Sequence, residues 1–134
     1  MPSNGAPNIF PYLRYEDAPT ALDWLEQTFG FKKIFEVPGP DGTIAHAQLA
    51  LGPGVVIVGT ASPDQGETSP RKLGAVPGGI YVYVEDVQEH FERAQAGGAE
   101  IVRELEHTEY DSTEYSALDL EGHHWSFGTF QPKA

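Results

Sequence analysis

The stretch Tyr15-Glu16-Asp17 leads into an apolar stripe that ends at Gly30, and Val84-Glu85-Asp86 leads into a second stripe that ends at Gly98. In both copies an acidic residue precedes apolar side chains at three- and four-residue spacing, which is typical of a capped amphipathic helix. A glycine after the stripe is the usual C-terminal stop. The chain therefore carries the same strand-to-helix unit twice, 68 or 69 residues apart.

A third pair of landmarks, the hairpin glycines Gly54 and Gly122, keeps the same spacing. A fixed offset through several landmarks indicates an internal repeat. We therefore expect one domain of 134 residues built from two halves, 8–60 and 79–130. The segment between them, 61–78, is rich in Pro, Gly, Ser and charged residues, and it is expected to be a mobile linker.

Each half predicts the same order of elements: a strand, a helix and three further strands. The first strand is expected over 8–15, where Pro11 favours a sheet edge or a strand start. In the second half, Trp125 and Phe127 of the last strand are assigned to the core by strand alternation. This order predicts an α+β fold in which a mixed, curved sheet carries its helices on the outer face and leaves the other face free to form a concavity.

The composition limits the kinds of partner. The chain has no cysteine, 20 acidic and 8 basic residues, and a formal net charge of −12. The absence of cysteine excludes disulfides and cysteine-ligated zinc, and it fits a cytoplasmic location. No membrane span is expected, and no nucleic-acid partner, because an acidic chain repels a polyanion. The charge favours solubility or, alternatively, the attraction of a cationic small molecule.

Five stretches occur in a fixed order: 13–17, 29–31, 45–49, 97–99 and 119–128. Together they resemble the vicinal oxygen chelate superfamily, which includes glyoxalase I, bleomycin-resistance proteins and extradiol dioxygenases. The resemblance covers nearly all of 9–130, although Leu120 stands where the family's closing turn usually has proline. It implies two tandem βαβββ modules of the glyoxalase/bleomycin-resistance type, which usually close around a pocket in a homodimer.

Enzymes of this superfamily hold a divalent metal through side chains on the first and last strands of each module. Carried across by the motifs, the four positions are Phe10, Val58, Gly79 and Ser126. None of them is His, Asp or Glu, the ligands that such a metal needs. We therefore expect no metal and no cofactor there, which favours a metal-free, bleomycin-resistance-like member.

Strand alternation predicts which side chains share the face of these four positions. The predicted ligand-binding residues are Phe10, Tyr12, Arg14, His46, Gln48, Val58, Tyr81, Tyr83, Glu114, Ser116, His124 and Ser126. Their aromatic rings would offer stacking and cation–π contacts to an aromatic or cationic molecule. Alternatively, Tyr81 and Tyr83 pack in an interface between the halves. Arg14 is expected to pair with a substrate anion or, with slight preference, with an internal carboxylate such as Glu114.

His46 and Glu114 occupy equivalent positions of the repeat. Meeting across a pocket, they would suit a catalytic base and its orienting partner, and with His124 they would suit a displaced metal. A polar pair in an apolar cavity, or two exposed groups, is the structural alternative. His90 on the second helix is expected to be solvated, and the adjacent His123 and His124 are expected not to line one pocket together.

Three functions remain open at this point. The first is a metal-free protein that binds an aromatic or cationic antibiotic or metabolite, as in antibiotic resistance. The second is a glyoxalase-like lyase or isomerase, or a dioxygenase, with a displaced metal. The third is a dimeric domain whose own aromatic side chains fill the concavity. The sequence favours the first, with a small-molecule ligand and a second copy of the chain as partners.

Overall fold

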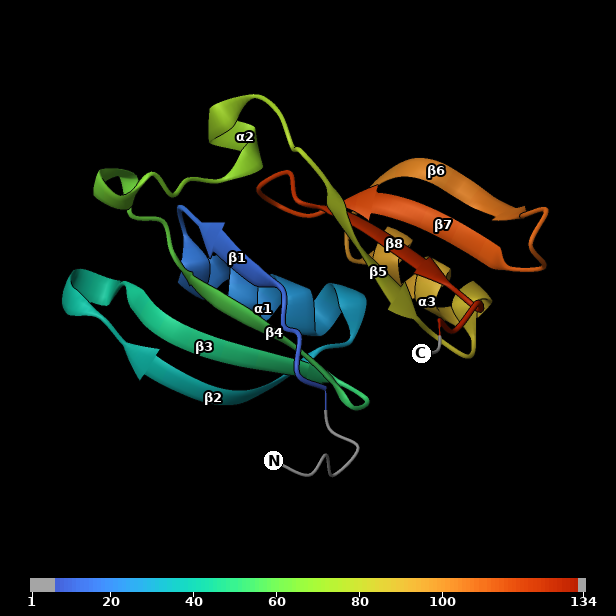
Figure 1. The fold of residues 1–134 in the computed structure, drawn as a ribbon, viewed down its shortest axis with the longest axis horizontal. Coiled ribbons are helices and arrows are strands. Elements are labelled where there is room, and N and C mark those ends of the chain that lie inside the picture. Colours follow the sequence, from blue (N-terminus) through green and yellow to red (C-terminus); the bar gives the residue numbers. More distant parts are fainter. Residues whose placement is uncertain (1–6, 133–134) are drawn as a thin grey trace.

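The computed structural model describes residues 7–132, which form two halves of equal topology (Figure 1). The first half contains β1 (Tyr12–Tyr15), α1 (Ala18–Phe29), β2 (Lys32–Pro38), β3 (Ile44–Leu51) and β4 (Gly54–Thr60). The second contains β5 (Gly79–Tyr83), α3 (Val87–Ala96), β6 (Glu100–His107), β7 (Thr113–Leu118) and β8 (His124–Gly128). Both follow the order that the repeat predicts, and the α+β fold is confirmed.

Each half forms its own four-stranded mixed sheet, ordered β1-β4-β3-β2 and β5-β8-β7-β6. The first strand of each half runs parallel to the last, and the other pairs are antiparallel. Figure 1 shows the sheets side by side, with β1 and β5 on the facing edges and the two long helices behind. β1 and β5 are not hydrogen-bonded neighbours in the described chain, so the halves meet as two sheets.

The two long helices begin and end as the sequence requires. Asp17 and Asp86 each accept a hydrogen bond from the backbone N–H of the third helical residue, which satisfies a donor that the helix itself leaves free. Gly30 ends α1 with a φ of 85°, a left-handed conformation in which a side chain would be strained.

Aromatic side chains join the two halves into one core. Phe29 at the end of α1 lies 4.9 Å from Phe127 and 5.6 Å from Trp125, measured between ring centroids, and all three are fully buried. Gly97, at the end of α3, leaves room for Thr28 of α1, because a Cβ at Gly97 would collide with the Thr28 side chain. The helices thereby hold the junction between the sheets, where the cavities described below lie.

Two segments differ from the sequence prediction. β1 begins at Tyr12 rather than at residue 8, because Pro11 has no N–H to donate to the sheet. The linker 61–78 has more structure than predicted, since it contains a 3₁₀ turn (Pro63–Gln65) and the short helix α2 (Pro70–Leu73). No helix in the described part of the chain is long and apolar enough to cross a membrane.

Candidate functional site

The face of the first sheet that points away from α1 combines aromatic rings with polar groups. The Arg14 guanidinium lies over the Tyr12 ring, with Cζ 4.2 Å from the ring centroid. On β3, His46 and Gln48 are hydrogen-bonded through their Nε2 atoms at 3.0 Å. Phe35 of β2 lies 6.0 Å from His46, ring to ring. Tyr12, Arg14, His46 and Gln48 thus share the face on which the alternation placed them.

Val58 does not lie on this face, and its prediction as a ligand-binding residue is wrong. It is fully buried in the core, beside its register partner Leu13. The β4 residue opposite Tyr12 and Gln48 is Ile57. The error arises because Ala50 pairs with Val55, whereas its equivalent Leu118 pairs with His124, one residue further along than the repeat predicts. The repeat therefore shifts by one position after the hairpin.

The equivalent face of the second sheet carries a hydrogen-bonded polar network. Oε1 of Glu114 accepts from Nη2 of Arg103 at 2.9 Å and from the Tyr110 hydroxyl at 2.8 Å. Nε of Arg103 donates to Oγ of Ser116 at 3.2 Å, and the hydroxyls of Ser116 and Ser126 are 2.7 Å apart. Burial opposes ionisation of Glu114, but the hydrogen bonds from Arg103 and Tyr110 outweigh it, and the pKa of Glu114 is lowered.

Arg14 has an internal partner, but the partner is Glu67 rather than Glu114. Nε of Arg14 lies 3.1 Å from Oε1 of Glu67, and Nη1 donates to the carbonyl of Thr60 at 3.3 Å. Gly59 makes this position possible, because a Cβ there would collide with Nη1. The sequence did not show that the linker folds back over β1 and brings Glu67 to this arginine.

His46, Glu114 and His124 do not come together within one chain. His46 lies on β3 of the first sheet and Glu114 on β7 of the second, and each is bonded to side chains of its own sheet. No group of three His, Cys, Asp or Glu residues able to hold a metal occurs among residues 7–132. A single chain therefore assembles neither the proposed His46–Glu114 pair nor the displaced metal site.

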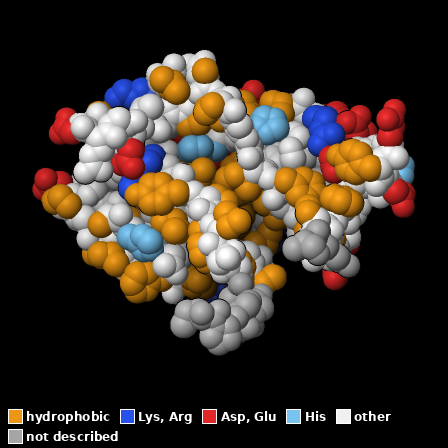
Figure 2. All heavy atoms as spheres, in the orientation of Figure 1, with side chains coloured by type: hydrophobic (Ala, Val, Ile, Leu, Met, Phe, Trp, Pro, Cys, Tyr) orange, Lys and Arg blue, Asp and Glu red, His pale blue; other side chains and the backbone are white. Residues whose placement is uncertain are grey.

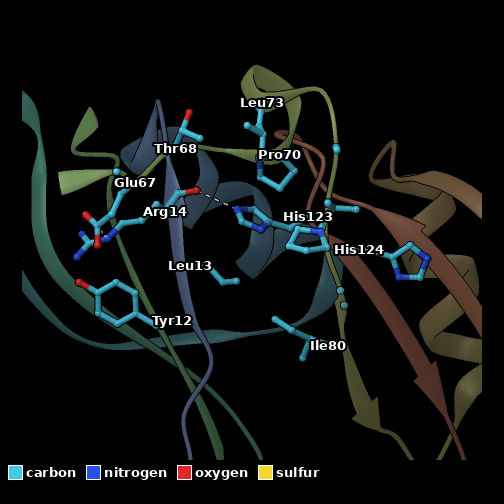
Figure 3. Close-up of a pocket in the computed structure, with 16 residues that line it drawn as sticks. Tyr12, Leu13, Arg14, Glu67, Thr68, Pro70, Leu73, Ile80, His123 and His124 are labelled. Atoms are coloured by element: carbon cyan, nitrogen blue, oxygen red, sulfur yellow. Dashed lines mark hydrogen bonds and ion pairs between the residues drawn. The ribbon is translucent and has the colours of Figure 1, made fainter. Parts of the chain in front are cut away.

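A cavity of about 520 Å³ lies where the linker crosses between β1 and β5, and we call it the linker cavity (Figure 3). Its lining comes from β1, from linker residues 66–68, 70, 73 and 75–78, from the start of β5 and from His123 and His124. Of the predicted residues it contains Tyr12, Arg14 and His124. Much of its wall is apolar, with side chains from Leu13, Leu73, Val76 and Ile80.

A second cavity, of about 320 Å³, lies between the β3–β4 hairpin, the segment before β1, and β5; we call it the hairpin cavity. It contains the predicted Tyr81 and Tyr83, with an apolar remainder that includes Ile9, Phe31 and Val55. No charged side chain lines it within the described chain. The Tyr81 hydroxyl donates to the carbonyl of Phe130 at 2.5 Å, which leaves the ring as its ligand-facing feature.

His123 is a site residue that the sequence did not predict. Its Nε2–H donates to the carbonyl of Arg14 at 2.9 Å, and its ring centroid lies 4.6 Å from that of Tyr15. His123 and His124 both line the linker cavity, contrary to the prediction, although Figure 3 shows their rings directed to different sides of β8. This is possible because the cavity lies at the end of the strand, between the sheets, rather than on one face.

His90 and Phe10 lie outside both cavities. His90 is not solvated: its two ring nitrogens bond to the Tyr115 hydroxyl at 2.5 Å and to the carbonyl of Phe29 at 2.7 Å. Phe10 is 41% exposed before β1 and lines neither cavity. The single chain thus divides eleven of the twelve predicted residues among two sheet faces, two cavities and the core, and leaves Phe10 outside all of these.

The sequence and the fold are also similar to those of known proteins. The sequence model of the Glyoxalase/Bleomycin resistance protein/Dioxygenase superfamily matches residues 9–127. The uncharacterised protein Mb0911c of Mycobacterium bovis is 34% identical over 131 residues, which cover 96% of this chain and 86% of that protein.

Solved structures give the same result. TioX from Micromonospora sp. ML1 is 35% identical, with a TM-score of 0.72, and the match covers 92% of this chain and 98% of TioX. FosX, a fosfomycin resistance protein from Listeria monocytogenes, has a TM-score of 0.68 over 95% of this chain and 93% of FosX. At 13% identity, FosX is similar in fold alone.

Proposed function

Because the chain belongs to the Glyoxalase/Bleomycin resistance protein/Dioxygenase superfamily, we propose that it is a metal-free member that binds a small aromatic molecule, an antibiotic or a metabolite. The hairpin cavity is the observation that carries this proposal. It places Tyr81 and Tyr83 in an apolar recess built from both halves of the chain. Its volume of about 320 Å³ lies at the lower end of the range for small-molecule sites.

The lining of the hairpin cavity favours an uncharged ring system over a cation. Tyrosine rings contribute about 0.5–1.5 kcal/mol per aromatic contact beyond the burial of area. A cation would gain a cation–π contact, but it would lose hydration in a cavity that offers no carboxylate within the described chain. The net charge of −12 raises the local concentration of cations without supplying a partner inside the cavity.

The proposed partner protein is a second copy of the chain. The open face of the first sheet exposes large apolar side chains, among them Tyr12 at 53% and Phe35 at 51%. Figure 2 shows hydrophobic side chains gathered across the middle of the face opposite the long helices, with acidic side chains toward the margins. Exposed apolar surface with a polar rim is typical of an interaction site. Light scattering coupled to gel filtration tests this, because a mass near 14.6 kDa would contradict the homodimer.

Titration with naphthalene, quinoline and the cation N-methylquinolinium tests the ligand class. We expect the neutral rings to bind more tightly and to shift the ring resonances of Tyr83. Tyr83→Ala should weaken this binding, and Val55→Trp should block the cavity. Tyr110→Ala is the matched control, since Tyr110 is an exposed tyrosine outside both cavities. Equal binding by wild type and Val55→Trp would contradict the assignment of the site.

Metal content of untagged protein, dialysed against mixed divalent ions, tests the metal-free part of the proposal. We expect no stoichiometric metal, because Phe10 before β1, Ile57 on β4, and Gly79 and Ser126 on β5 and β8 offer no imidazole or carboxylate. One metal ion per chain that resists chelation would contradict the proposal. It would favour the lyase, isomerase or dioxygenase alternative, with ligands supplied across two chains.

A further inference from the structure

We propose that the linker cavity is a second small-molecule site, separate from the hairpin cavity. Its ligand is a neutral, mostly apolar molecule that carries one hydroxyl or N–H group, which donates a hydrogen bond to Nδ1 of His123. The volume of about 520 Å³ falls within the range of small-molecule sites. The proposal concerns residues that the hairpin cavity does not share, apart from Ile80.

The wall that the linker contributes is fixed by hydrogen bonds to both halves. On the first half, the Glu16 carboxylate accepts from the backbone N–H of Ser69 at 3.1 Å and from the Thr68 hydroxyl at 3.2 Å. On the second half, Nε of Arg71 donates to the carbonyl of Leu120 at 3.0 Å. The linker is therefore held in place over β1 and β5, and it forms a fixed wall of the cavity.

The tautomer of His123 follows from its partner. A carbonyl oxygen only accepts hydrogen bonds, so Nε2, which lies 2.9 Å from the Arg14 carbonyl, carries the proton. In the neutral ring, Nδ1 is then a hydrogen-bond acceptor. The backbone N–H of His123 donates to Oδ1 of Asp119 at 3.1 Å, which fixes the residue from its other side.

Nδ1 of His123 is an acceptor that the protein leaves open. It has no hydrogen-bond partner among residues 7–132, and it does not belong to the fully buried side-chain atoms that lack such a partner, so part of its surface is accessible. His123 as a whole is 9% exposed and lines the linker cavity. Figure 3 shows its ring on the side of the cavity next to β1, near Leu13. A ligand donor in the cavity would satisfy this acceptor.

The charges around the cavity favour a neutral ligand. Nε of Arg14 lies 3.1 Å from Oε1 of Glu67, so these two charges neutralise each other. The Thr68 hydroxyl donates its hydrogen bond to Glu16. A charged ligand would lose hydration against apolar walls such as Leu73 and Val76 without gaining a free counter-charge. A ring system with one donor instead buries its apolar surface and makes one hydrogen bond.

The test uses 1-naphthol and 1-methoxynaphthalene, which differ in the donor, and two-dimensional ¹H–¹⁵N spectra of the histidine rings. We expect 1-naphthol to shift Nδ1 of His123 and to bind about fivefold more tightly than its methyl ether, as one hydrogen bond predicts. His123→Phe should bind both probes equally. Val76→Trp, which fills the cavity from a partly exposed linker position, should abolish binding at this site.

Tyr83→Ala separates the two sites, because Tyr83 lines only the hairpin cavity. We expect it to leave the response of His123 to 1-naphthol unchanged. No response of His123 in wild type, no preference for the hydroxyl, or unaltered binding to Val76→Trp would each overturn the second site. A response confined to Tyr83 would overturn the second site and leave the proposed function intact. A response confined to His123 would overturn the proposed function and leave the second site intact.

Discussion

The hydroxyl of Tyr15 donates a hydrogen bond of 2.6 Å to Oδ2 of Asp119, which lies 104 residues away. The indole N–H of Trp125 donates to the same oxygen at 3.0 Å. Tyr15 and Trp125 are fully buried, and Asp119 is 3% exposed. One carboxylate therefore ties β1 of the first half to the closing hairpin of the second, beside the junction that carries both cavities.

Replacing Tyr15 by Phe should destabilise the protein by about 1.5–3 kcal/mol, the range for a hydrogen bond to a charged group. The ring remains, so the loss reports the hydroxyl and leaves Oδ2 of Asp119 with Trp125 as its remaining side-chain donor. Urea denaturation measures the free energy of unfolding. Tyr12→Phe is the matched control, because Tyr12 is 53% exposed. Equal losses in both variants would contradict the role given to Asp119.

Alkaline pH should destabilise the protein through its buried tyrosines. Burial, and then the negative charge of Asp119, raise the pKa of Tyr15, and burial alone raises the pKa of Tyr115. The unfolded chain ionises these groups near pH 10, whereas the folded chain does not. Their contribution is therefore complete below about pH 10 and is lost above it. Urea midpoints between pH 8 and 11 should fall, and they should fall less steeply in Tyr15→Phe.

Mild acid should destabilise the protein through His90. Burial, helped by the nearby charge of Arg93, lowers the pKa of His90, although the hydrogen bond to Phe29 opposes this. The unfolded chain takes up a proton near pH 6.5 that the folded chain resists. The contribution is therefore present above about pH 6.5 and is lost as the pH falls below it. Unfolding free energies at pH 7.5 and 5.5 should differ less in His90→Gln than in wild type, and an unchanged difference would contradict this assignment.

Replacing Glu114 by Gln should destabilise the protein by about 1.5–3 kcal/mol, the range for a hydrogen bond to a charged group. The Glu114 side chain is 4% exposed and accepts from both Arg103 and Tyr110. Glu106→Gln is the matched control, because Glu106 pairs with the same arginine from a 55% exposed side chain. Exposed pairs contribute about 0–1 kcal/mol, so thermal unfolding should show a much smaller loss for the control.

Much of the fold was accessible from the sequence because the signals were local and occurred twice. The acidic caps, the helical stripes and the closing glycines place both helices, and alternation places Trp125 and Phe127 in the core, where they are fully buried. The error at Val58 was also local in origin. A single extra residue in the second hairpin moved the repeat out of register, and one residue of slip turns a strand side chain to the other face.

The candidate site was only partly accessible because most of its contacts join distant segments. Arg14 was recognised as a paired cation, but Glu67 reaches it only because the linker folds back over β1. The tautomer of His123 is set by the carbonyl of Arg14, which lies 109 residues away in the chain. The sequence contained no signal for either contact, since neither follows from periodicity or spacing.

The amino-acid sequence by itself determined the two βαβββ units, because caps, stripes and alternation depend on residues close together in the chain. Only the tertiary structure decided how the units meet: two separate sheets, a linker fixed to both, and two cavities at the junction. The physical reason is that burial of Phe29 against Trp125 and Phe127, and the bond from Tyr15 to Asp119, depend on packing between the halves. Such packing cannot be predicted from the local sequence pattern of either half.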